Sequence, residues 1–208
     1  MSEFPHTDRL VLRRFTESDV DNLVELDSDP RVMRFLTNGR PTPRADIEDR
    51  VLPMMLRLAP AGFWAAEDRE TGTFLGWFAL EPGEPGEVEL GYRLRAETWG
   101  RGLATEGARA LVRIAFDELG VDRVWAQTMA VNTASRRVMA KAGLRYVRTF
   151  HPHFDDPIPG TEHGEVEYGL RREEWRSPLP QAISSRGRRP RTRRPAGRAA
   201  PRTCRSAR

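Results

Sequence analysis

Two glycines, Gly100 and Gly102, lie between a strand-like segment, 87–94, and a segment with helical periodicity, 104–119. Glycine lacks a Cβ atom, so the backbone there can turn tightly and approach a ligand closely. The helix that follows would direct unpaired amides and the positive end of its dipole toward the turn. Its apolar residues recur at intervals of three and four, as on one face of a helix: Ala104, Ala108, Leu111, Ala115 and Leu119. The segment therefore predicts an anion-binding turn suited to a ligand that carries phosphate.

This turn differs from the two familiar nucleotide-binding motifs. No Gly-Lys-Ser/Thr follows the glycines, which disfavours a P-loop. The pattern Gly-x-Gly-x-Ala lies in mid-chain, which disfavours a dinucleotide-binding fold. Because a Gly-x-Gly turn can also be no more than a tight connection, the neighbouring elements must decide what binds there.

The hydrophobic pattern along the chain predicts strands and helices in the order β-α-α-α-β-β-β-α-β-α-β-β. Thr16 or Ser18 can cap the first helix, and Gly143 suits a left-handed C-cap of the last. The third helix, which Pro53 is expected to kink, would bury Ile47, Val51, Met54, Met55 and Leu58. The expected strands are 8–15, 63–68, 73–80, 87–94, 123–129, 144–150 and 165–170, and the expected helices are 16–26, 30–36, 42–58, 104–119 and 132–142. This order predicts an α/β (α+β) fold with a mixed sheet flanked by helices.

Length and composition favour one folded domain followed by a basic tail. The 208 residues carry a formal net charge of +4, but residues 186–208 contain ten arginines and no acidic residue, which leaves −6 on the rest. Beyond about residue 177, Pro, Arg, Ser and Ala dominate, and such a composition cannot bury enough apolar surface to offset the ordering entropy. We therefore expect a domain over 1–176 and a disordered tail over 177–208.

The cysteine content and the hydropathy pattern bear on the location of the chain. Cys204 is the single cysteine, so no disulfide framework can form. No apolar run reaches the length of a membrane span, and residues 1–5 lack the basic and apolar regions of a signal peptide. The expected location is the cytoplasm.

Three sequence motifs together resemble the GNAT acyltransferase superfamily. They are Glu-Leu-Gly-Tyr-Arg-Leu at 89–94, Trp-Gly-Arg-Gly-Leu-Ala-Thr-Glu at 99–106 and Asn-Thr-Ala-Ser-Arg-Arg-Val-Met-Ala-Lys-Ala-Gly-Leu at 132–144. The resemblance covers about residues 7–176 and is closest to the branch named for the ribosomal-protein N-terminal acetyltransferases. Trp99 stands at the first position of the pyrophosphate loop, where the superfamily often has Gln or Arg, and tryptophan is usual in this branch. The resemblance implies a mostly antiparallel sheet whose central strands splay apart.

The resemblance also implies acetyl-CoA as the co-substrate and indicates where it would bind. The pantetheine arm would lie along the strand that ends at Leu94, in the space where this strand separates from 123–129. Asn132 would contact the cofactor and Ser135 would lie near its sulfur, although Asn132 can instead simply cap its helix. The Arg101 side chain would either contact a phosphate or remain in solvent. The pyrophosphate would lie on the backbone of Gly100, Arg101, Gly102, Leu103, Ala104 and Thr105.

Transfer of an acetyl group to an amine needs a neutral nucleophile, a stabilised oxyanion and a leaving thiolate. Members of the superfamily often carry a glutamate on the central strand, so Glu89 is the first candidate for the base. Glu87, two residues earlier on the same face, is its competitor, and Glu89 can alternatively be a solvent-facing strand residue. Ser135 would donate a proton to the thiolate or only position the sulfur, and an amide near Tyr92 or Arg93 would hold the oxyanion.

The acceptor pocket is expected between segment 30–58, the central hairpin and the late segment 151–168. Trp77, His151 and Glu165 are the candidate contacts. Hairpin aromatics are more often part of a core: Trp64, Trp77 and Phe78. The acidic residues of the late segment suit a cationic amine and offer an alternative base: Glu162, Glu165 and Glu167. The His-x-His motif that begins at His151 is a weak metal signal, and we expect no metal.

Two functions from different classes are compatible with these features. The first is acetyl-CoA-dependent N-acetyl transfer, directly to a protein or peptide N-terminus or to a small-molecule amine. The second is a non-catalytic CoA-sensing or nucleic-acid-associated module that uses the basic tail. For the first we expect a monomer or homodimer with no membrane and no specific nucleic-acid partner, and only nonspecific polyanion contact by the tail.

Overall fold

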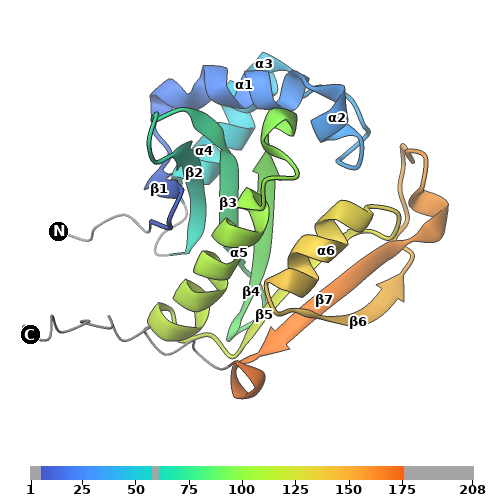
Figure 1. Ribbon diagram of the computed structural model, residues 1–208. Helices are drawn as coiled ribbons and strands as arrows, with labels where there is room; N and C mark the ends of the chain where they lie inside the picture. Colours follow the sequence, from blue (N-terminus) through green and yellow to red (C-terminus); the bar gives the residue numbers. More distant parts are fainter. Residues whose placement is uncertain (1–5, 58–60, 176–208) are drawn as a thin grey trace, which may run out of the picture. The chain divides into compact units, whose positions relative to one another are not determined.

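A seven-stranded sheet forms the centre of the molecule, with the strand order β1-β2-β3-β4-β5-β7-β6 (Figure 1). The computed structural model describes residues 6–57 and 61–175. The strands are β1 (Leu10–Arg14), β2 (Gly62–Asp68), β3 (Phe74–Pro82), β4 (Glu87–Leu94), β5 (Arg123–Met129), β6 (Arg145–Phe150) and β7 (Glu165–Arg171). Neighbouring strands are antiparallel except β4 and β5, which run parallel. The predicted mixed, mostly antiparallel sheet is confirmed.

Helices cover the two faces of this sheet. The α-helices are α1 (Val20–Ser28), α2 (Pro30–Met33), α3 (Arg44–Asp46), α4 (Leu52–Arg57), α5 (Leu103–Arg113) and α6 (Thr133–Lys141). Short 3-10 turns are η1 (Glu17–Asp19), η3 (Ala96–Thr98), η5 (Thr161–His163) and η6 (Arg172–Glu174), and π-helical turns are η2 (Ile47–Val51) and η4 (Ile114–Glu118). Helices α1, α2 and α4 pack with β2 and β3 on one face, and α5 and α6 pack on the other (Figure 1).

Alternate side chains of β3 enter two different cores. Phe78 and Leu80 pack in the core under α5, whereas Trp77 and Ala79 pack in the core under α1 and α4. Successive residues of a strand face opposite sides of the sheet, so a strand that is covered on both faces needs the continuous apolar run seen in this sequence. A Cβ atom at Gly107 of α5 would lie 2.2 Å from the Phe78 ring, so glycine is required where α5 crosses β3.

The predicted helix over 42–58 is not continuous. It consists of α3, η2 and α4, and the N–H of Leu52 bonds to the carbonyl of Ile47, five residues back. Pro53 has no amide hydrogen, and its ring would clash with the carbonyl four residues earlier in a regular helix. The wider turn before Pro53 avoids this clash, so the predicted kink takes the form of a π-helical turn.

The apolar face predicted for this helix is correct only in part. Ile47 and Met55 are buried, but the side chain of Met54 is 37% exposed, so its predicted burial is wrong. The inserted residue of the π-helical turn rotates the residues that follow it, which takes Met54 away from the core. Leu58 lies outside the described residues.

The remaining boundaries differ from the prediction by a few residues at most. The helix expected over 30–36 ends at Met33. Thr16 is the N-cap before the first helix, as one of the two expected residues; its backbone N–H donates to Asp19 Oδ2 at 2.9 Å and its hydroxyl donates to the same oxygen at 3.1 Å. Gly143 has the expected left-handed backbone, with φ of 103°.

The predicted tail over 177–208 lies outside the residues that the structure describes. Within 6–57 and 61–175, no helix has the length and apolar content needed to cross a membrane.

Candidate active site

Strands β4 and β5 separate after a short pairing, which opens the centre of the sheet. Their parallel pairing joins Glu87 to Arg123 and ends where Glu89 is opposite Trp125. Beyond this point β4 continues to Leu94, whereas β5 remains paired with β7 along its whole length. The expected splay of the central strands is confirmed, and Glu89 stands at the point of separation.

Every second residue of β4 directs its backbone N–H and C=O groups toward this opening. The N–H of Arg95 bonds to the carbonyl of Leu75 at 2.9 Å, so the odd-numbered residues at this end of β4 pair with β3. Because backbone hydrogen bonds alternate between the two sides of a strand, the N–H and C=O groups of Leu90, Tyr92 and Leu94 face the opening. An extended ligand with amide groups can pair with such an edge as an added strand does.

The glycine turn has the backbone of an anion site. Gly100 and Gly102 have φ of 75° and 82°, a region that favours glycine. Among the described residues, nothing lies within 4 Å of a Cβ atom built on Gly100, so the turn is open on that side. No side chain of the described chain caps α5, so its first amides have no intrahelical partner: Leu103, Ala104 and Thr105.

An ion pair that the sequence analysis did not identify holds this turn against β1. Arg9 Nε donates to Glu106 Oε2 at 2.7 Å, and Arg9 Nη1 donates to the carbonyl of Arg101 at 2.9 Å. The Thr7 hydroxyl also donates to Glu106. Glu106 is the last residue of the glycine-turn motif, and its partners are nearly a hundred positions away, so no local pattern marks them. The Arg101 side chain is exposed, and its contact with a phosphate remains a prediction.

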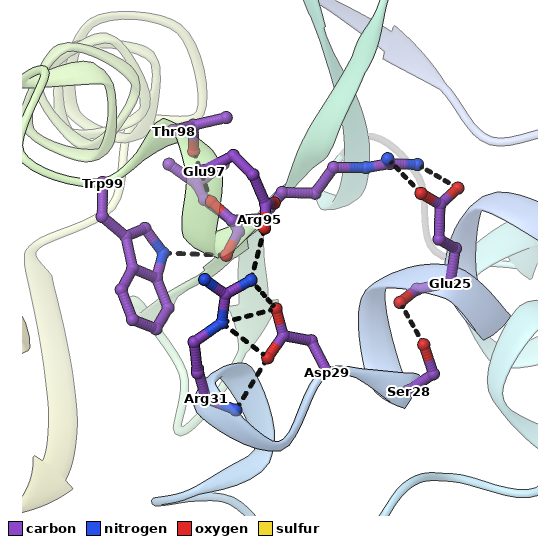
Figure 2. Close-up of polar contacts among 9 residues, drawn as sticks. Glu25, Ser28, Asp29, Arg31, Arg95, Glu97, Thr98 and Trp99 are labelled. Atoms are coloured by element: carbon purple, nitrogen blue, oxygen red, sulfur yellow. Dashed lines mark hydrogen bonds and ion pairs between the residues drawn. The ribbon is translucent and has the colours of Figure 1, made fainter.

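Trp99 lies at the end of β4, where its indole contacts the main chain (Figure 2). Its Nε1 donates to the carbonyl of Leu94 at 2.9 Å, although the residue is 51% exposed. The tryptophan at the first loop position therefore ties the loop to the strand. It also occupies the Leu94 carbonyl, so the N–H of Leu94 is the group left to face the opening.

A hollow of about 370 Å³ lies between α1, α2 and the segment before the glycine turn (Figure 2). Arg95 donates to both oxygens of Glu25, at 2.6 and 2.7 Å. Arg31 bonds to Asp29 at 2.6 Å and also to Glu97. Each of these groups is in an ion pair, but the three carboxylates exceed the two arginines by one negative charge, and the ion pairs connect the two helices to the segment before the turn.

Tyr92 and Ser135 meet across the opening. The Tyr92 hydroxyl lies 2.9 Å from Ser135 Oγ and 3.1 Å from the Ser135 carbonyl oxygen. Burial raises the pKa of Tyr92 to about 12, and the hydrogen bond with Ser135 opposes this shift only in part. Tyr92 therefore stays protonated at neutral pH. The sequence suggests only the amide of Tyr92 or Arg93 as a candidate group, because no local pattern marks the contact of the Tyr92 hydroxyl with Ser135.

Asn132 caps α6, as one of the two interpretations of the sequence expected. Its Oδ1 accepts from the backbone N–H of Ser135 at 3.2 Å, and its Nδ2 donates to Thr128 Oγ1 at 3.1 Å. Both polar ends of the side chain therefore have partners within the protein. A contact of Asn132 with the cofactor remains a prediction.

Glu89 is a half-buried carboxyl group at the point where the strands separate. Its pKa is raised to about 7, chiefly by burial and also by the neighbouring charges of Glu81 and Glu167, whereas the hydrogen bond with Gln127 lowers it. A carboxylate with a pKa near the working pH is suited to accept a proton. Its competitor Glu87 forms an ion pair with Arg123 at 2.7 Å, so the geometry favours Glu89.

The candidate acceptor contacts do not gather around Glu89. Trp77 is 9% exposed and packs edge-on against Phe63 at 5.3 Å between ring centroids, which fits a core residue. Glu165 is opposite Met129 of β5, whereas Glu89 is opposite Trp125 of the same strand. Met129 and Trp125 are four residues apart, a separation of roughly 13 Å along the strand. Burial raises the pKa of Glu165. His151 is exposed on the loop between β6 and β7. No cluster of metal-ligating side chains occurs in the described part of the chain.

Comparison with known proteins gives a consistent result. The family model described as "Acetyltransferase (GNAT) domain" matches residues 9–145. A relative from Aspergillus fumigatus, "FsC-acetyl coenzyme A-N(2)-transacetylase", is 40% identical over 180 residues, which cover 82% of this chain and 77% of the relative. These matches identify an enzyme and give no support to the alternative of a non-catalytic module.

Solved structures share the fold. A GNAT-family acetyltransferase from Bacillus anthracis superposes with a TM-score of 0.68 at 24% identity and covers 82% of this chain and 99% of its own. RimL, a ribosomal alpha-N-protein acetyltransferase in complex with coenzyme A, has a TM-score of 0.68 at 17% identity, with coverage of 83% and 99%. The family match, the curated relative and the splayed sheet agree: this chain belongs to the GNAT family of acetyltransferases.

Proposed function

We propose that this chain transfers the acetyl group of acetyl-CoA directly to the nitrogen of a primary amine, with Glu89 as the base. The observation that carries the proposal is the position of Glu89. Its half-buried carboxyl group, with a pKa of about 7, stands where β4 leaves β5 and just before the strand edge that faces the opening. On this account the chain works in the cytoplasm, as its sequence suggests.

The glycine turn and the free edge of β4 suit the two parts of the acetyl-CoA molecule. The pyrophosphate would bind to the amides between Gly100 and Thr105, beside the open space at Gly100. The pantetheine arm would pair with the edge of β4 that ends at Leu94. Ser135, one helical turn after Asn132, would lie near the sulfur.

The reaction then requires three groups of this chain. Glu89 takes a proton from the acceptor nitrogen, whose lone pair attacks the thioester carbonyl carbon. The Tyr92 amide faces the opening and would hold the oxyanion, whereas the Arg93 amide pairs with β3. As the carbon–sulfur bond breaks, Ser135 donates its proton to the thiolate and is reprotonated by Tyr92. The second proton that the acylated nitrogen loses restores Tyr92 through solvent, and Glu89 releases its proton to solvent as the products leave. The products are the N-acetyl amine and coenzyme A.

The acceptor that fits this base best is an α-amine. The name of the Aspergillus relative places its acetyl group at N(2), which in ordinary numbering is the nitrogen on carbon 2. An α-amino group has a pKa near 8 and a lysine amine near 10.4. Proton transfer to a base of pKa about 7 therefore costs about 1.4 kcal/mol from an α-amine and about 4.6 kcal/mol from a lysine.

Two isomers of one substrate test this proposal. Lysine amide blocked at the ε nitrogen presents only an α-amine, and lysine amide blocked at the α nitrogen presents only an ε-amine. With acetyl-CoA at pH 7.5, release of the free thiol measures turnover of each. We expect kcat/KM to be at least tenfold higher for the free α-amine. A preference for the ε-amine, or no thiol release with either isomer or with a wider panel of amines, would contradict the proposal.

A further inference from the structure

Glu81 of β3 lies directly opposite Glu89 of β4 in the antiparallel register. Residues in such positions share a face of the sheet, with Cβ atoms about 4.5–5.5 Å apart. The Glu81 carboxylate extends over β4 beside Gly91, because its Oε1 lies 3.8 Å from the position that a Cβ atom on Gly91 would take. The two carboxyl groups therefore occupy one patch of the sheet, with bare glycine backbone beside them.

Neither of these carboxyl groups has an arginine partner among the described residues. Glu81 makes no hydrogen bond or ion pair within 6–57 and 61–175, and burial raises its pKa. Nearby carboxylates behave differently, since Glu87 pairs with Arg123, and Glu167 pairs with Arg123 and Arg148. Like charges directly opposite each other destabilise a sheet, so an unpaired Glu81–Glu89 contact is costly unless one group keeps its proton.

The charged groups on the surrounding elements do not neutralise this pair. Three arginines on the same face are already engaged: Arg123 with Glu87 and Glu167, Arg148 with Glu167, and Arg93 with Asp27 of α1. Arg171, opposite Arg123, is exposed at the end of β7. Glu165 lies further along β7 and adds negative charge. Glu81 is thus the unneutralised group placed closest to Glu89 by strand pairing.

We propose that Glu81 sets the proton affinity of Glu89, so that the pair holds a single negative charge at neutral pH and is ready to receive the ammonium form of the acceptor. Glu81 acts through Glu89 and is a positioning residue rather than a catalytic one. The inference rests on the proposed role of Glu89 as the base. An ionised Glu81 shifts the loss of the proton from Glu89 to a higher pH, which makes Glu89 a stronger base than an ordinary carboxylate.

The test measures the ionisation of Glu89 first by NMR titration and then through the pH dependence of turnover. The carboxyl carbons of carbon-13-labelled glutamate are titrated by NMR in the wild type and in Glu81→Gln, and Glu89→Gln assigns the signal. The matched control is Glu84→Gln, which removes the same charge from the exposed turn of the same hairpin. We expect the Glu89 midpoint to fall by about one unit or more in Glu81→Gln and to stay within about 0.2 unit of wild type in Glu84→Gln.

Turnover gives an independent readout of the same shift. The ratio of variant to wild-type kcat/KM is compared across pH, because ionisation of the amine is common to both enzymes and cancels. For a midpoint that falls by one unit from pH 7, the ratio at pH 6 should be about fivefold higher than at pH 9. A Glu89 midpoint unchanged by Glu81→Gln would overturn the inference. If the NMR midpoint falls and the turnover ratio stays flat, the pair is real and the proposed base is wrong.

Discussion

The hydroxyl of Tyr92 on β4 and the hydroxyl of Ser135 on α6 share a hydrogen bond of 2.9 Å across the opening between the central strands. The two residues come from elements 43 positions apart, and the contact forms because the capped start of α6 lies over the free edge of β4. Burial keeps the tyrosine protonated. In the proposed reaction this neutral pair would supply the proton that the leaving thiolate takes up.

Removal of either hydroxyl should slow the reaction without unfolding the protein. We expect Tyr92→Phe and Ser135→Ala each to lower kcat by about tenfold, because a thiol of pKa near 8.5 needs only modest assistance to leave. The double variant should be no slower than the slower single variant, since the two hydroxyls act as one unit. Tyr146→Phe is the control, because Tyr146 also bonds a hydroxyl, Thr149 Oγ1 at 2.8 Å, but on the exposed edge strand. Fully additive losses would contradict a shared proton path.

Replacement of Gly102 by valine should abolish tight binding of acetyl-CoA. A side chain at this position would project from the turn beside the amides proposed to bind phosphate, and the backbone φ of 82° would be strained. Gly72→Val is the matched control, because Gly72 has φ of 70° and open surroundings in the β2–β3 turn. Both variants should lose about 1–2 kcal/mol of stability. By calorimetry, only Gly102→Val should lose affinity for acetyl-CoA, by at least tenfold. An undiminished affinity would show that the pyrophosphate does not bind at this turn.

The raised pKa of Glu89 should also be visible in stability. The folded state holds this proton to about pH 7, whereas an unfolded glutamate releases it near 4.5. The stabilising effect of the protonated group is therefore complete below pH 4.5 and is lost as the pH rises through 7. Melting temperatures of Glu89→Gln should exceed those of wild type by an amount that grows between pH 5 and pH 8. A difference that is constant over this range, as expected for Glu84→Gln, would show that Glu89 titrates normally.

The elements around the site could be predicted because their signals are local. The turn at 82–86 and the glycine turn mark the two ends of an alternating apolar segment in the sequence. The strand predicted there, 87–94, coincides with β4. Asn132 with Ser135 marks the start of α6 in the same way, because an N-cap bonds to an amide three residues on.

The contacts that define the chemistry could not be predicted, because they depend on register. Glu81 faces Glu89 only because of the length of the β3–β4 turn, and Glu87 meets Arg123 only through the parallel pairing of β4 with β5. The same dependence applies to Trp77. Its place in the core under α1 follows from which residues of β3 face the helices, a property that a continuous apolar run does not reveal.

The most direct test of this account is the pH dependence of acetyl transfer by Glu89→Gln. General-base catalysis typically contributes about 10² to 10⁴ in rate. With saturating acetyl-CoA and an α-amine acceptor, we expect kcat/KM to fall by a factor in that range and the ionisation near pH 7 to disappear from the profile, while calorimetry shows unchanged affinity for acetyl-CoA. Near-normal turnover with the wild-type pH profile would contradict the role of Glu89 and would indicate that another carboxylate or water accepts the proton of the amine.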